Sequence, residues 1–458
     1  MKIFYNQIIA KSFFSIFLIV TVSINFAYSQ NIVVGYYPDW LELTLPPQTI
    51  EFENLTHVVH AFAWPQSNGN ISFYQGMFNY GLVSATHNAG RKVLLALGGW
   101  GHSDGFAPLA ADSLARNIFI NNVVELINDK NYDGIDLDWE YPSNIIERKN
   151  LTKLIKEIRE KFDQENPEWL ITMAVSGGSY NGQYIEFSEL VDYIDWFSMM
   201  GYDYHGSWTI HAGHNAPIYQ PSNCNDGADD LGIIFLKTAR QVPGNKLLLG
   251  VPFYGKEFDA TGLYQPITGN VTDLYYSDIA PRLSSSNWEY YWDDFSKVPY
   301  LLNTDHTKFV TYDDTISIRI KCEYAKENQL AGIMFWALGQ DIISNKQILL
   351  ETIGKNMGLT TSVETNVNQS DNGFYLYDNY PNPFNPITKI TYIVPGTSFV
   401  TLRIFDSIGE EVTTLVDEIK PTGKYEVDFD GTGLASGVYT YMLSSGNFTQ
   451  IKKMILLK

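Results

Sequence analysis

Cysteine and positive charge are both scarce in this chain. Cys224 and Cys322 are its two cysteines among 458 residues, so at most one disulfide can form, and nothing in the sequence shows whether they meet. No CxxC motif or histidine pair indicates a metal site, and the scattered histidines are interpreted as structural. Lys and Arg number 31 against 51 Asp and Glu, a formal net charge of −20. This charge excludes nucleic acid and anionic lipid as electrostatic partners.

A long hydrophobic run is also missing. The apolar stretch at residues 13–24 is about a dozen residues long, shorter than the roughly 20 that a membrane-spanning helix needs. Lys2 and Lys11 precede it, and residues 27–29, Ala-Tyr-Ser, supply small residues at the positions that a signal peptidase reads. We therefore expect residues 1–29 to be a signal peptide rather than a membrane anchor. The mature protein is expected outside the cytoplasm.

Aromatic residues, by contrast, are plentiful, with 30 Tyr, 26 Phe and 10 Trp. Most of them fill hydrophobic cores, but exposed aromatic rings also stack well on neutral rings such as those of sugars. The composition therefore suits a neutral, sugar-like ligand.

The chain divides at a polar segment, residues 360–373, which has almost no large apolar side chain. We interpret it as a linker between a domain at residues 30–359 and a second one at residues 374–458. One helical face in the first domain is formed by Leu151, Leu154, Ile155, Ile158 and Phe162. A similar, interrupted stripe is formed by Ile118, Phe119, Asn122, Val123 and Leu126.

Short β-rich runs alternate with these helical patterns. The candidate strands are residues 32–37, 56–63, 92–98, 134–140, 170–175, 196–200, 247–252 and 332–336. Eight such units predict an α/β fold, a (β/α)₈ TIM barrel, whose active site lies at the C-terminal ends of the strands. The connection from residue 253 to about 309 is unusually long and aromatic, so we predict a small α+β insertion at about 257–308 that walls one side of the cleft.

The fourth candidate strand carries three acids two residues apart, in the segment DGIDLDWE at residues 133–140. Because side chains alternate along a strand, Asp136, Asp138 and Glu140 face one side and the apolar residues between them face the other. Crowded carboxyls disfavour ionisation of one another, and such perturbed groups are typical of acid catalysts. Glu140, as the last residue of the strand, is expected at the rim of the active site.

The stretch DGIDLDWEYP resembles the DxxDxDxE signature of glycoside hydrolase family 18, the chitinases and their relatives. The resemblance covers most of residues 31–358. Its other motifs, in family order, are GYYPDW from Gly35, KVLLALGGW from Lys92, MGYDYHGSW from Met200, GHNAPIY from Gly213, GVPFYG from Gly250, FVTYDD from Phe309 and GIMFWAL from Gly332. Ala96 stands where the family often has Ser, which affects only a hydrogen bond supporting Asp136.

The resemblance implies retaining hydrolysis in which the substrate supplies the nucleophile. Glu140 would protonate the glycosidic oxygen, the 2-acetamido oxygen would attack the anomeric carbon, and water would open the oxazolinium ion. Asp138 would orient the acetamido N–H, and Asp136 would share a proton with it. Tyr202 would hydrogen-bond the acetamido oxygen, and Asp203 would bind the distorted sugar or tune the acid.

The resemblance also implies an aromatic substrate cleft that needs no metal or organic cofactor. Trp336 would be the floor on which the sugar in the cleaved subsite stacks. Further candidate substrate contacts are Tyr36, Trp40, Phe62, Trp64, Trp100, Tyr141, Met200 and Trp208. Trp100 is preferred among the outer tryptophans because it directly follows a Gly-Gly turn. His205 is expected to support the loop of Tyr202 and Asp203.

Chitin or chitooligosaccharides are the expected substrate, and a monomer is the expected state. An endo-β-N-acetylglucosaminidase acting on N-glycan cores is an alternative, because it shares the acids and the mechanism. The YDYHGSW stretch and the insertion favour chitin over this alternative. A non-catalytic sugar-binding lectin on the same barrel is less favoured, because Glu140, Asp138 and Tyr202 are all present.

Residues 374–458 are predicted to form a small β-sandwich. Strand-like runs at residues 389–394, 401–405, 425–429 and 437–443 alternate with Gly, Pro and Asn turns. The stretches YPNPFNPITKITYIVP from Tyr380 and LASGVYTYML from Leu434, with basic Lys452 and Lys453, resemble the sorting domain of bacterial type IX secretion. The resemblance implies binding to the secretion machinery and export across an outer membrane to a secreted or surface-attached state. A carbohydrate-binding module is the alternative, but it would more often show exposed Trp, and this segment has no Trp.

Overall fold

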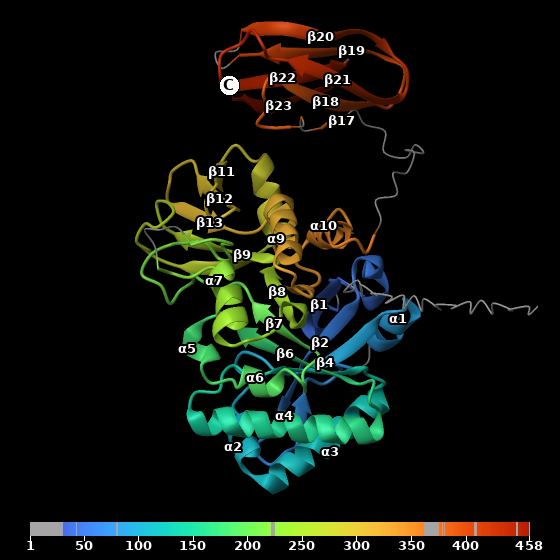
Figure 1. Cartoon of the computed structure of the whole chain (residues 1–458), viewed down its shortest axis with the longest axis vertical. Coiled ribbons are helices and arrows are strands. Elements are labelled where there is room, and N and C mark those ends of the chain that lie inside the picture. Colours follow the sequence, from blue (N-terminus) through green and yellow to red (C-terminus); the bar gives the residue numbers. More distant parts are fainter. Residues whose placement is uncertain are drawn as a thin grey trace, which may run out of the picture. The chain divides into compact units, whose positions relative to one another are not determined.

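The computed structural model describes residues 31–42, 44–78, 81–220, 225–360, 375–377, 379, 381–406, 410–445 and 448–457 (Figure 1). The chain forms two compact units, one ending at Thr361 and the other beginning at Ser362. Each unit has its own core of buried apolar side chains. The predicted signal peptide and most of the predicted linker lie outside the described residues.

The first unit is built on a closed barrel of eight parallel strands. They are β1 (Ile32–Pro38), β2 (His57–Pro65), β4 (Lys92–Gly98), β5 (Gly134–Asp138), β6 (Leu170–Ser176), β7 (Trp196–Met200), β8 (Leu247–Pro252) and β14 (Gly332–Trp336). Their order is β1-β14-β8-β7-β6-β5-β4-β2, and β2 pairs back onto β1. The predicted TIM barrel is therefore confirmed. One detail was wrong, because β5 ends at Asp138 and Glu140 lies two residues beyond it.

Alternation along the strands separates two cores. Side chains such as Val34, Val59, Leu94, Leu248 and Met334 fill the inside of the barrel as one buried cluster. The residues between them face outward and join the larger cluster under the helices. The barrel interior is thus packed, which leaves the ends of the strands as the place for a cleft.

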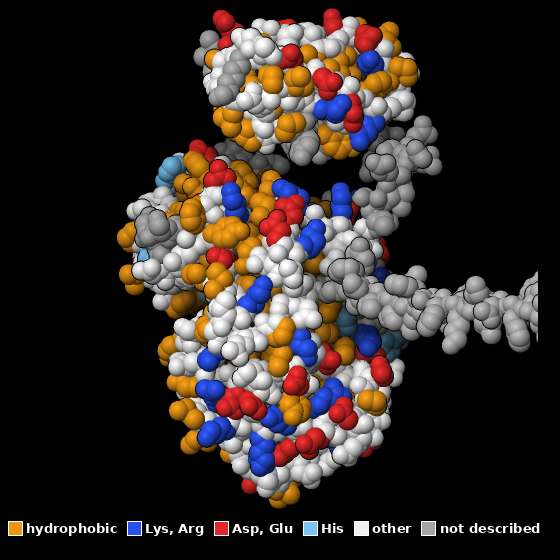
Figure 2. All heavy atoms as spheres, in the orientation of Figure 1, with side chains coloured by type: hydrophobic (Ala, Val, Ile, Leu, Met, Phe, Trp, Pro, Cys, Tyr) orange, Lys and Arg blue, Asp and Glu red, His pale blue; other side chains and the backbone are white. Residues whose placement is uncertain are grey.

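Helix α4 (Ile145–Glu165) covers the barrel with the apolar face that the sequence predicts, and the five residues of that face are fully buried. Asn144 caps the helix by accepting hydrogen bonds from two backbone N–H groups. On its outer side the ion pairs Arg159–Asp163 and Lys161–Glu165 are spaced four residues apart. Figure 2 shows acidic and basic side chains intermixed over this region.

Helix α3 (Ser113–Lys130) lies beside α4 and follows its predicted stripe less closely. Phe119 and Val123 are buried as expected, but Ile118, Asn122 and Leu126 are half-buried. The buried face is completed by Ala115, Ile120 and Ile127. The stripe predicted from the sequence therefore differs by about one residue from the face of α3 that packs on the barrel.

The long connection after β8 forms an antiparallel five-stranded sheet with short helices, so the predicted α+β insertion is present. Its strands are β9 (Tyr254–Asp259), β10 (Val271–Tyr275), β11 (Trp288–Asp293), β12 (Val298–Asn303) and β13 (Lys308–Thr311), in the order β10-β9-β13-β12-β11. The helix α8 (Tyr276–Ile279) follows β10. The sheet includes residues on both sides of 257–308, because β9 begins directly after β8 and β13 extends to Thr311.

The second unit contains two antiparallel sheets, as predicted for the C-terminal region. One has the order β17-β18-β21 and the other β20-β19-β22-β23. The strands are β17 (Tyr375–Leu376), β18 (Ile387–Val394), β19 (Ser398–Phe405), β20 (Glu411–Lys420), β21 (Gly423–Asp430), β22 (Gly437–Ser445) and β23 (Phe448–Leu456). Three of them, β17, β20 and β23, were not among the predicted runs, and Lys452 and Lys453 lie within β23.

Two further findings bear on the sequence interpretation. No helix in the described part of the chain is long and apolar enough to cross a membrane. Cys322 is a free, buried thiol, and burial raises its pKa to about 12. Cys224 lies outside the described residues.

Candidate active site

A cleft of about 1200 Å³ opens at the C-terminal ends of the barrel strands. Eleven of the predicted site residues line it, namely Tyr36, Trp40, Phe62, Trp100, Asp138, Glu140, Tyr141, Met200, Tyr202, Asp203 and Trp336. Lining residues that sequence reasoning did not select include Tyr74, His102, Asn181, Asp226, Tyr254, Asp273, Tyr275 and Asp278. Several of these come from the insertion and from long loops, whose position in space no local pattern predicts.

The two acids of β5 and Glu140 just beyond it lie at different depths. Asp136 is 1% exposed and Asp138 is 4% exposed, whereas Glu140 is half-buried and lines the cleft. On the opposite face Ile135 and Leu137 are fully buried, and Trp139 stacks on Phe106 at 5.3 Å between ring centroids. The alternation expected from the sequence therefore holds, and it points the acids into the barrel and its mouth.

Asp136 is held by two hydroxyl donors at the bottom of the site. Tyr36 Oη donates to its Oδ2 at 2.7 Å, and Thr172 Oγ1 donates to its Oδ1. Thr172 stands directly opposite Asp136 in the β5–β6 pairing, so it replaces the hydrogen bond that Ala96 cannot make. Burial raises the pKa of Asp136 to about 6, while the two donors act in the opposite direction.

Asp138 sits between the other two acids and is the most perturbed of the three. Burial, then the charges of Glu140 and Asp136, raise its pKa well above the usual range of an aspartate. Its Oδ1 is buried and has no hydrogen-bond partner among the described residues. Of the three acids, Asp138 is therefore the one whose ionised form the site disfavours most.

Glu140 also has a raised pKa, but the cause differs from the expectation of crowding by two aspartates. Burial is the main cause, the charge of Asp203 adds to it, and a hydrogen bond from Tyr141 opposes it. The Glu140–Tyr141 peptide bond is cis, as are two others at this end of the barrel, Ala61–Phe62 and Trp336–Ala337.

Ser103 fixes the turn that carries Glu140 out of the strand. Its Oγ accepts a hydrogen bond from the Glu140 N–H at 3.0 Å, and lies 3.2 Å from the backbone oxygens of both Gly99 and Asp138, to which it can donate. The Gly99 N–H donates to the same Asp138 oxygen at 2.8 Å. Sequence reasoning missed Ser103, because its function depends on a loop that returns to the end of a neighbouring strand.

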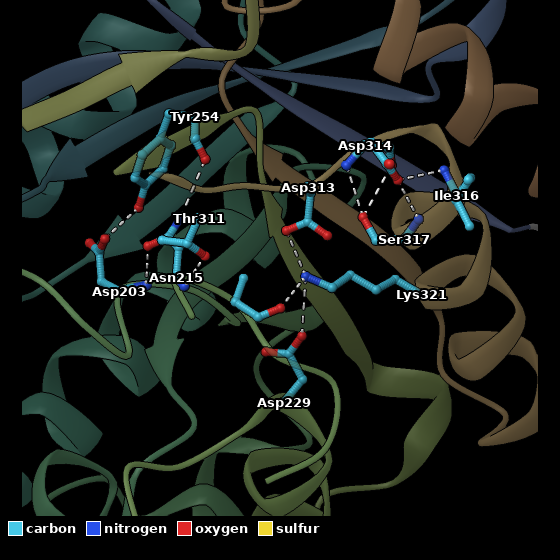
Figure 3. Close-up of polar contacts among 11 residues, drawn as sticks. Asp203, Asn215, Asp229, Tyr254, Thr311, Asp313, Asp314, Ile316, Ser317 and Lys321 are labelled. Atoms are coloured by element: carbon cyan, nitrogen blue, oxygen red, sulfur yellow. Dashed lines mark hydrogen bonds and ion pairs between the residues drawn. The ribbon is translucent and has the colours of Figure 1, made fainter. Parts of the chain in front are cut away.

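Asp203 is positioned from the insertion side of the cleft. Tyr254 Oη donates to Asp203 Oδ1 at 2.7 Å, and Lys256 Nζ lies 3.0 Å from the same oxygen. Asn215 accepts from the Asp203 N–H and donates to the Tyr254 carbonyl (Figure 3). The Asp203 backbone has φ of 64°, the left-handed region in which Asp is one of the tolerated residues. GVPFYG was recognised as a motif, but the contact of its Tyr254 with Asp203 was not foreseen.

Trp336 forms an aromatic floor with its neighbours. Its ring stacks on Phe62 with centroids 5.6 Å apart and an interplanar angle of 18°, and it contacts Tyr36 and Trp40 at 5.7 and 6.2 Å. Tyr202 stands nearby, and its hydroxyl makes a weak contact of 3.9 Å with Met334 Sδ. The floor is therefore preorganised, while the Tyr202 hydroxyl keeps hydrogen-bonding capacity.

The outer tryptophans occupy different positions relative to the cleft. Trp100 is 80% exposed and lines the cleft, and Trp40 also lines it. Trp208 is 61% exposed but does not line the cleft; Lys256 Nζ lies 5.3 Å from its ring centroid. Trp64 stacks on His102 at 4.4 Å and faces an adjacent shallow depression.

Comparison with known proteins identifies this architecture. The family model described as glycosyl hydrolases family 18 matches residues 32–341. The chain belongs to this family. The model for the secretion system C-terminal sorting domain matches residues 378–457. The protein is thus a glycosyl hydrolase that carries a sorting domain for export, to the cell surface or the medium.

Similar proteins include proteins named as chitinases and solved chitinase structures. Chitinase A1 of Niallia circulans is 33% identical over 288 residues, which cover 56% of this chain and 41% of that protein. Probable chitinase 2 of Drosophila melanogaster is 30% identical over 359 residues, covering 68% of this chain and 72% of that protein. The crystal structure of Ostrinia furnacalis Group IV chitinase in complex with allosamidin has a TM-score of 0.66 at 27% identity, covering 72% of this chain and 99% of that one.

Proposed function

We propose that this exported hydrolase is a chitinase, which cleaves β-1,4 bonds between N-acetylglucosamine units with retention and acts as a monomer. The observation that carries the proposal is the buried Asp138 Oδ1 without a partner, placed between a raised-pKa Glu140 and the charged Asp136. An unsatisfied buried acceptor next to a cleft is costly. An acetamido N–H of the substrate would satisfy it.

Glu140 would act first as acid and then as base. Its raised pKa keeps the proton available near neutral pH, and it delivers this proton to the glycosidic oxygen as the bond to the anomeric carbon breaks. The acetamido oxygen of the same sugar attacks that carbon and forms an oxazolinium ion. Glu140, now a carboxylate, takes a proton from water, and the resulting attack restores the starting anomeric configuration.

The other residues of the site would bind and orient the sugar. Tyr202 offers its hydroxyl to the acetamido oxygen, where charge develops. Asp203, held by Tyr254, contacts the distorted sugar and raises the pKa of Glu140. Trp336 stacks on the apolar face of that sugar. The remaining proposed substrate contacts are the predicted residues that line the cleft, Tyr36, Phe62, Trp100, Tyr141 and Met200.

The first test is cleavage of an N-acetylglucosamine hexamer, with products resolved by anomer. The wild-type protein should release short products initially as the β-anomer, and Glu140→Gln should lose at least about a hundredfold in kcat, since it removes the acid. The fully deacetylated hexamer should not be cleaved, because it lacks the internal nucleophile. Rapid cleavage of the deacetylated hexamer would refute the substrate-assisted mechanism.

The two alternatives give different results in the same assay. An endo-β-N-acetylglucosaminidase would leave the hexamer intact and release N-glycans from a glycoprotein. A lectin would bind the hexamer without cleaving it. One solved relative, described as a family 18 N-acetylglucosaminidase from Paenibacillus barengoltzii, is 27% identical with a TM-score of 0.64. Release of monosaccharide alone from the hexamer would therefore indicate that activity in place of a chitinase.

A further inference from the structure

Two histidines and one aspartate meet beside the active-site cleft. His205 and His211 lie in the loop after β7, and Asp226 lies just before α7 (Asp229–Ile234). One ligand atom from each lies within 4.8 Å of the other two. His205 Nε2 is 3.1 Å from Asp226 Oδ2, and His211 Nε2 is 3.7 Å from Asp226 Oδ1. Nothing in the proposed reaction uses this cluster.

The hydrogen bonds of the two rings point both Nε2 atoms at the aspartate. His205 Nδ1 lies 2.9 Å from the His214 carbonyl oxygen, and His211 Nδ1 lies 3.3 Å from that of Ala212. A carbonyl oxygen can only accept, so each Nδ1 carries the proton. In a neutral imidazole the lone pair is then on Nε2. Histidines that bind metal ions are oriented in this way by an outer carbonyl group.

In this arrangement the Nε2 lone pair of His205 faces the carboxylate of Asp226. His205 is 2% exposed, and its Nε2 makes no hydrogen bond of regular geometry with any described residue. His205 Nε2 lies 3.1 Å from Asp226 Oδ2, so two electron-rich atoms are in contact. A cation between them removes that repulsion.

We propose that His205, His211 and Asp226 form a binding site for a divalent transition metal ion of the zinc type. Two imidazole nitrogens and one carboxylate are a common zinc ligand set, with bonds of about 2.0–2.2 Å. Tetrahedral ligands at that distance lie ~3.4 Å apart. The separations of 3.1 and 3.7 Å are close to this value, and the third, which is at most 4.8 Å, would shorten on binding.

The surroundings of the cluster favour binding of a cation and leave the site accessible to solvent. Asp226 lines the cleft together with Asp203, Asp273 and Asp278. Lys256 Nζ lies 3.0 and 2.8 Å from Asp203 and Asp273, so these acids outnumber the cation beside them and leave a negative potential. The side chains of His211 and Asp226 are 28% and 29% exposed, so an ion can enter and keep a water ligand. The loop that carries His211 is already tied to the insertion, because the Ala212 N–H donates to the Gln265 oxygen. A bound ion would therefore brace the wall of the cleft.

The test is zinc binding by the full chain after treatment with EDTA and dialysis into metal-free buffer. Calorimetric titration with ZnCl₂ should show about one equivalent bound, and Zn²⁺ should raise Tm because the ion binds the folded state. His211→Gln should weaken binding by more than tenfold, since it removes a ligand and even an outer-shell loss costs about that much. Asp226→Asn is the second ligand variant, in case His211→Gln does not fold.

The matched control is His306→Gln, which removes an exposed histidine of the insertion that lies outside the cluster. It should bind Zn²⁺ as the wild type does. Co²⁺ should give visible d–d absorption with the wild type and His306→Gln, and lose it with His211→Gln. The proposal is overturned if the metal-free wild type binds no Zn²⁺, or if both ligand variants bind it as tightly as the wild type. In that case a proton on His205 takes the place of the ion.

Discussion

The ionisation of Asp136 depends on side chains of the barrel that can be named. Its two hydroxyl donors, Tyr36 and Thr172, stabilise the ionised form, and burial opposes them. In the proposed mechanism Asp136 must be charged while Asp138 and Glu140 hold protons. Activity should therefore fall at low pH when Asp136 becomes protonated, and at high pH when Glu140 loses its proton.

Tyr36→Phe is expected to move the acidic limb of the kcat/KM profile to higher pH. The substitution removes one donor to a buried carboxylate, and such a bond is worth about 1.5–3 kcal/mol, which corresponds to roughly one to two pH units. The ring remains in place beside Trp336. The control is Tyr74→Phe, another cleft tyrosine, whose hydroxyl contacts His102 instead of an acid. An acidic limb that does not move in Tyr36→Phe would show that Asp136 is not the group that titrates there.

Trp100→Ala should weaken binding of long substrates without slowing the chemical step. Trp100 lines the cleft and is 80% exposed, so its face is open to a sugar ring. An aromatic contact of this kind is worth about 1 kcal/mol, so KM for the hexamer should rise about fivefold and kcat should stay unchanged. Trp208→Ala is the matched control, because this exposed tryptophan does not line the cleft. Equal effects of the two substitutions would contradict an outer subsite at Trp100.

At the scale of elements, the strands and the acid row could be predicted because their signals are local. The period of two along β5 fixes which face Asp136 and Asp138 occupy, and it follows from the sequence alone. Ser103, Thr172 and Tyr254 could not be found this way, since each acts across a strand pairing or a long loop. The same holds for the histidine cluster, because a search for close histidine pairs does not detect ligands 6 and 15 residues apart.

Helix α9 (Thr315–Glu327) is anchored by a buried cation that the sequence does not reveal. Lys321 Nζ donates to the Ala216 oxygen at 2.7 Å and to Asp313 at 2.9 Å, and lies 3.6 Å from Asp229 Oδ2 (Figure 3). The lysine and both aspartates are buried. Burial, the main cause, raises the pKa of Asp229 to about 8, although Lys321 acts to lower it.

Lys321→Met should destabilise the barrel by about 3–5 kcal/mol, since it leaves two buried carboxyls without their cation. Loss of the lysine charge would raise the pKa of Asp229 further, so the loss of stability should be somewhat larger at pH 8 than at pH 5. Urea unfolding at both pH values measures this. Lys161→Met, which breaks only the exposed pair with Glu165, should cost less than about 0.5 kcal/mol. A loss as small as that of Lys161→Met would show that Lys321 does not anchor α9.

At the scale of the whole molecule, catalysis and export belong to separate units. Every residue that lines the cleft precedes Thr361, and the sorting domain has its own core of residues such as Ile390, Leu402 and Tyr441. Neither function therefore needs side chains from the other unit.

A chain that lacks residues 362–458 should keep the kcat and KM of the full-length protein on the hexamer but remain inside the outer membrane. Fractionation of a type IX-secreting bacterium, with activity measured in medium, surface and periplasm, tests this. In the reciprocal experiment, residues 1–29 and 362–458 fused to the ends of a fluorescent protein should carry it to the surface or medium. Glu140→Gln is the control for export, because it removes activity without changing the sorting domain. If the truncated chain reached the medium as efficiently as the full-length chain, the second unit would not be its sorting signal, and a carbohydrate-binding function would be tested next by chitin pull-down.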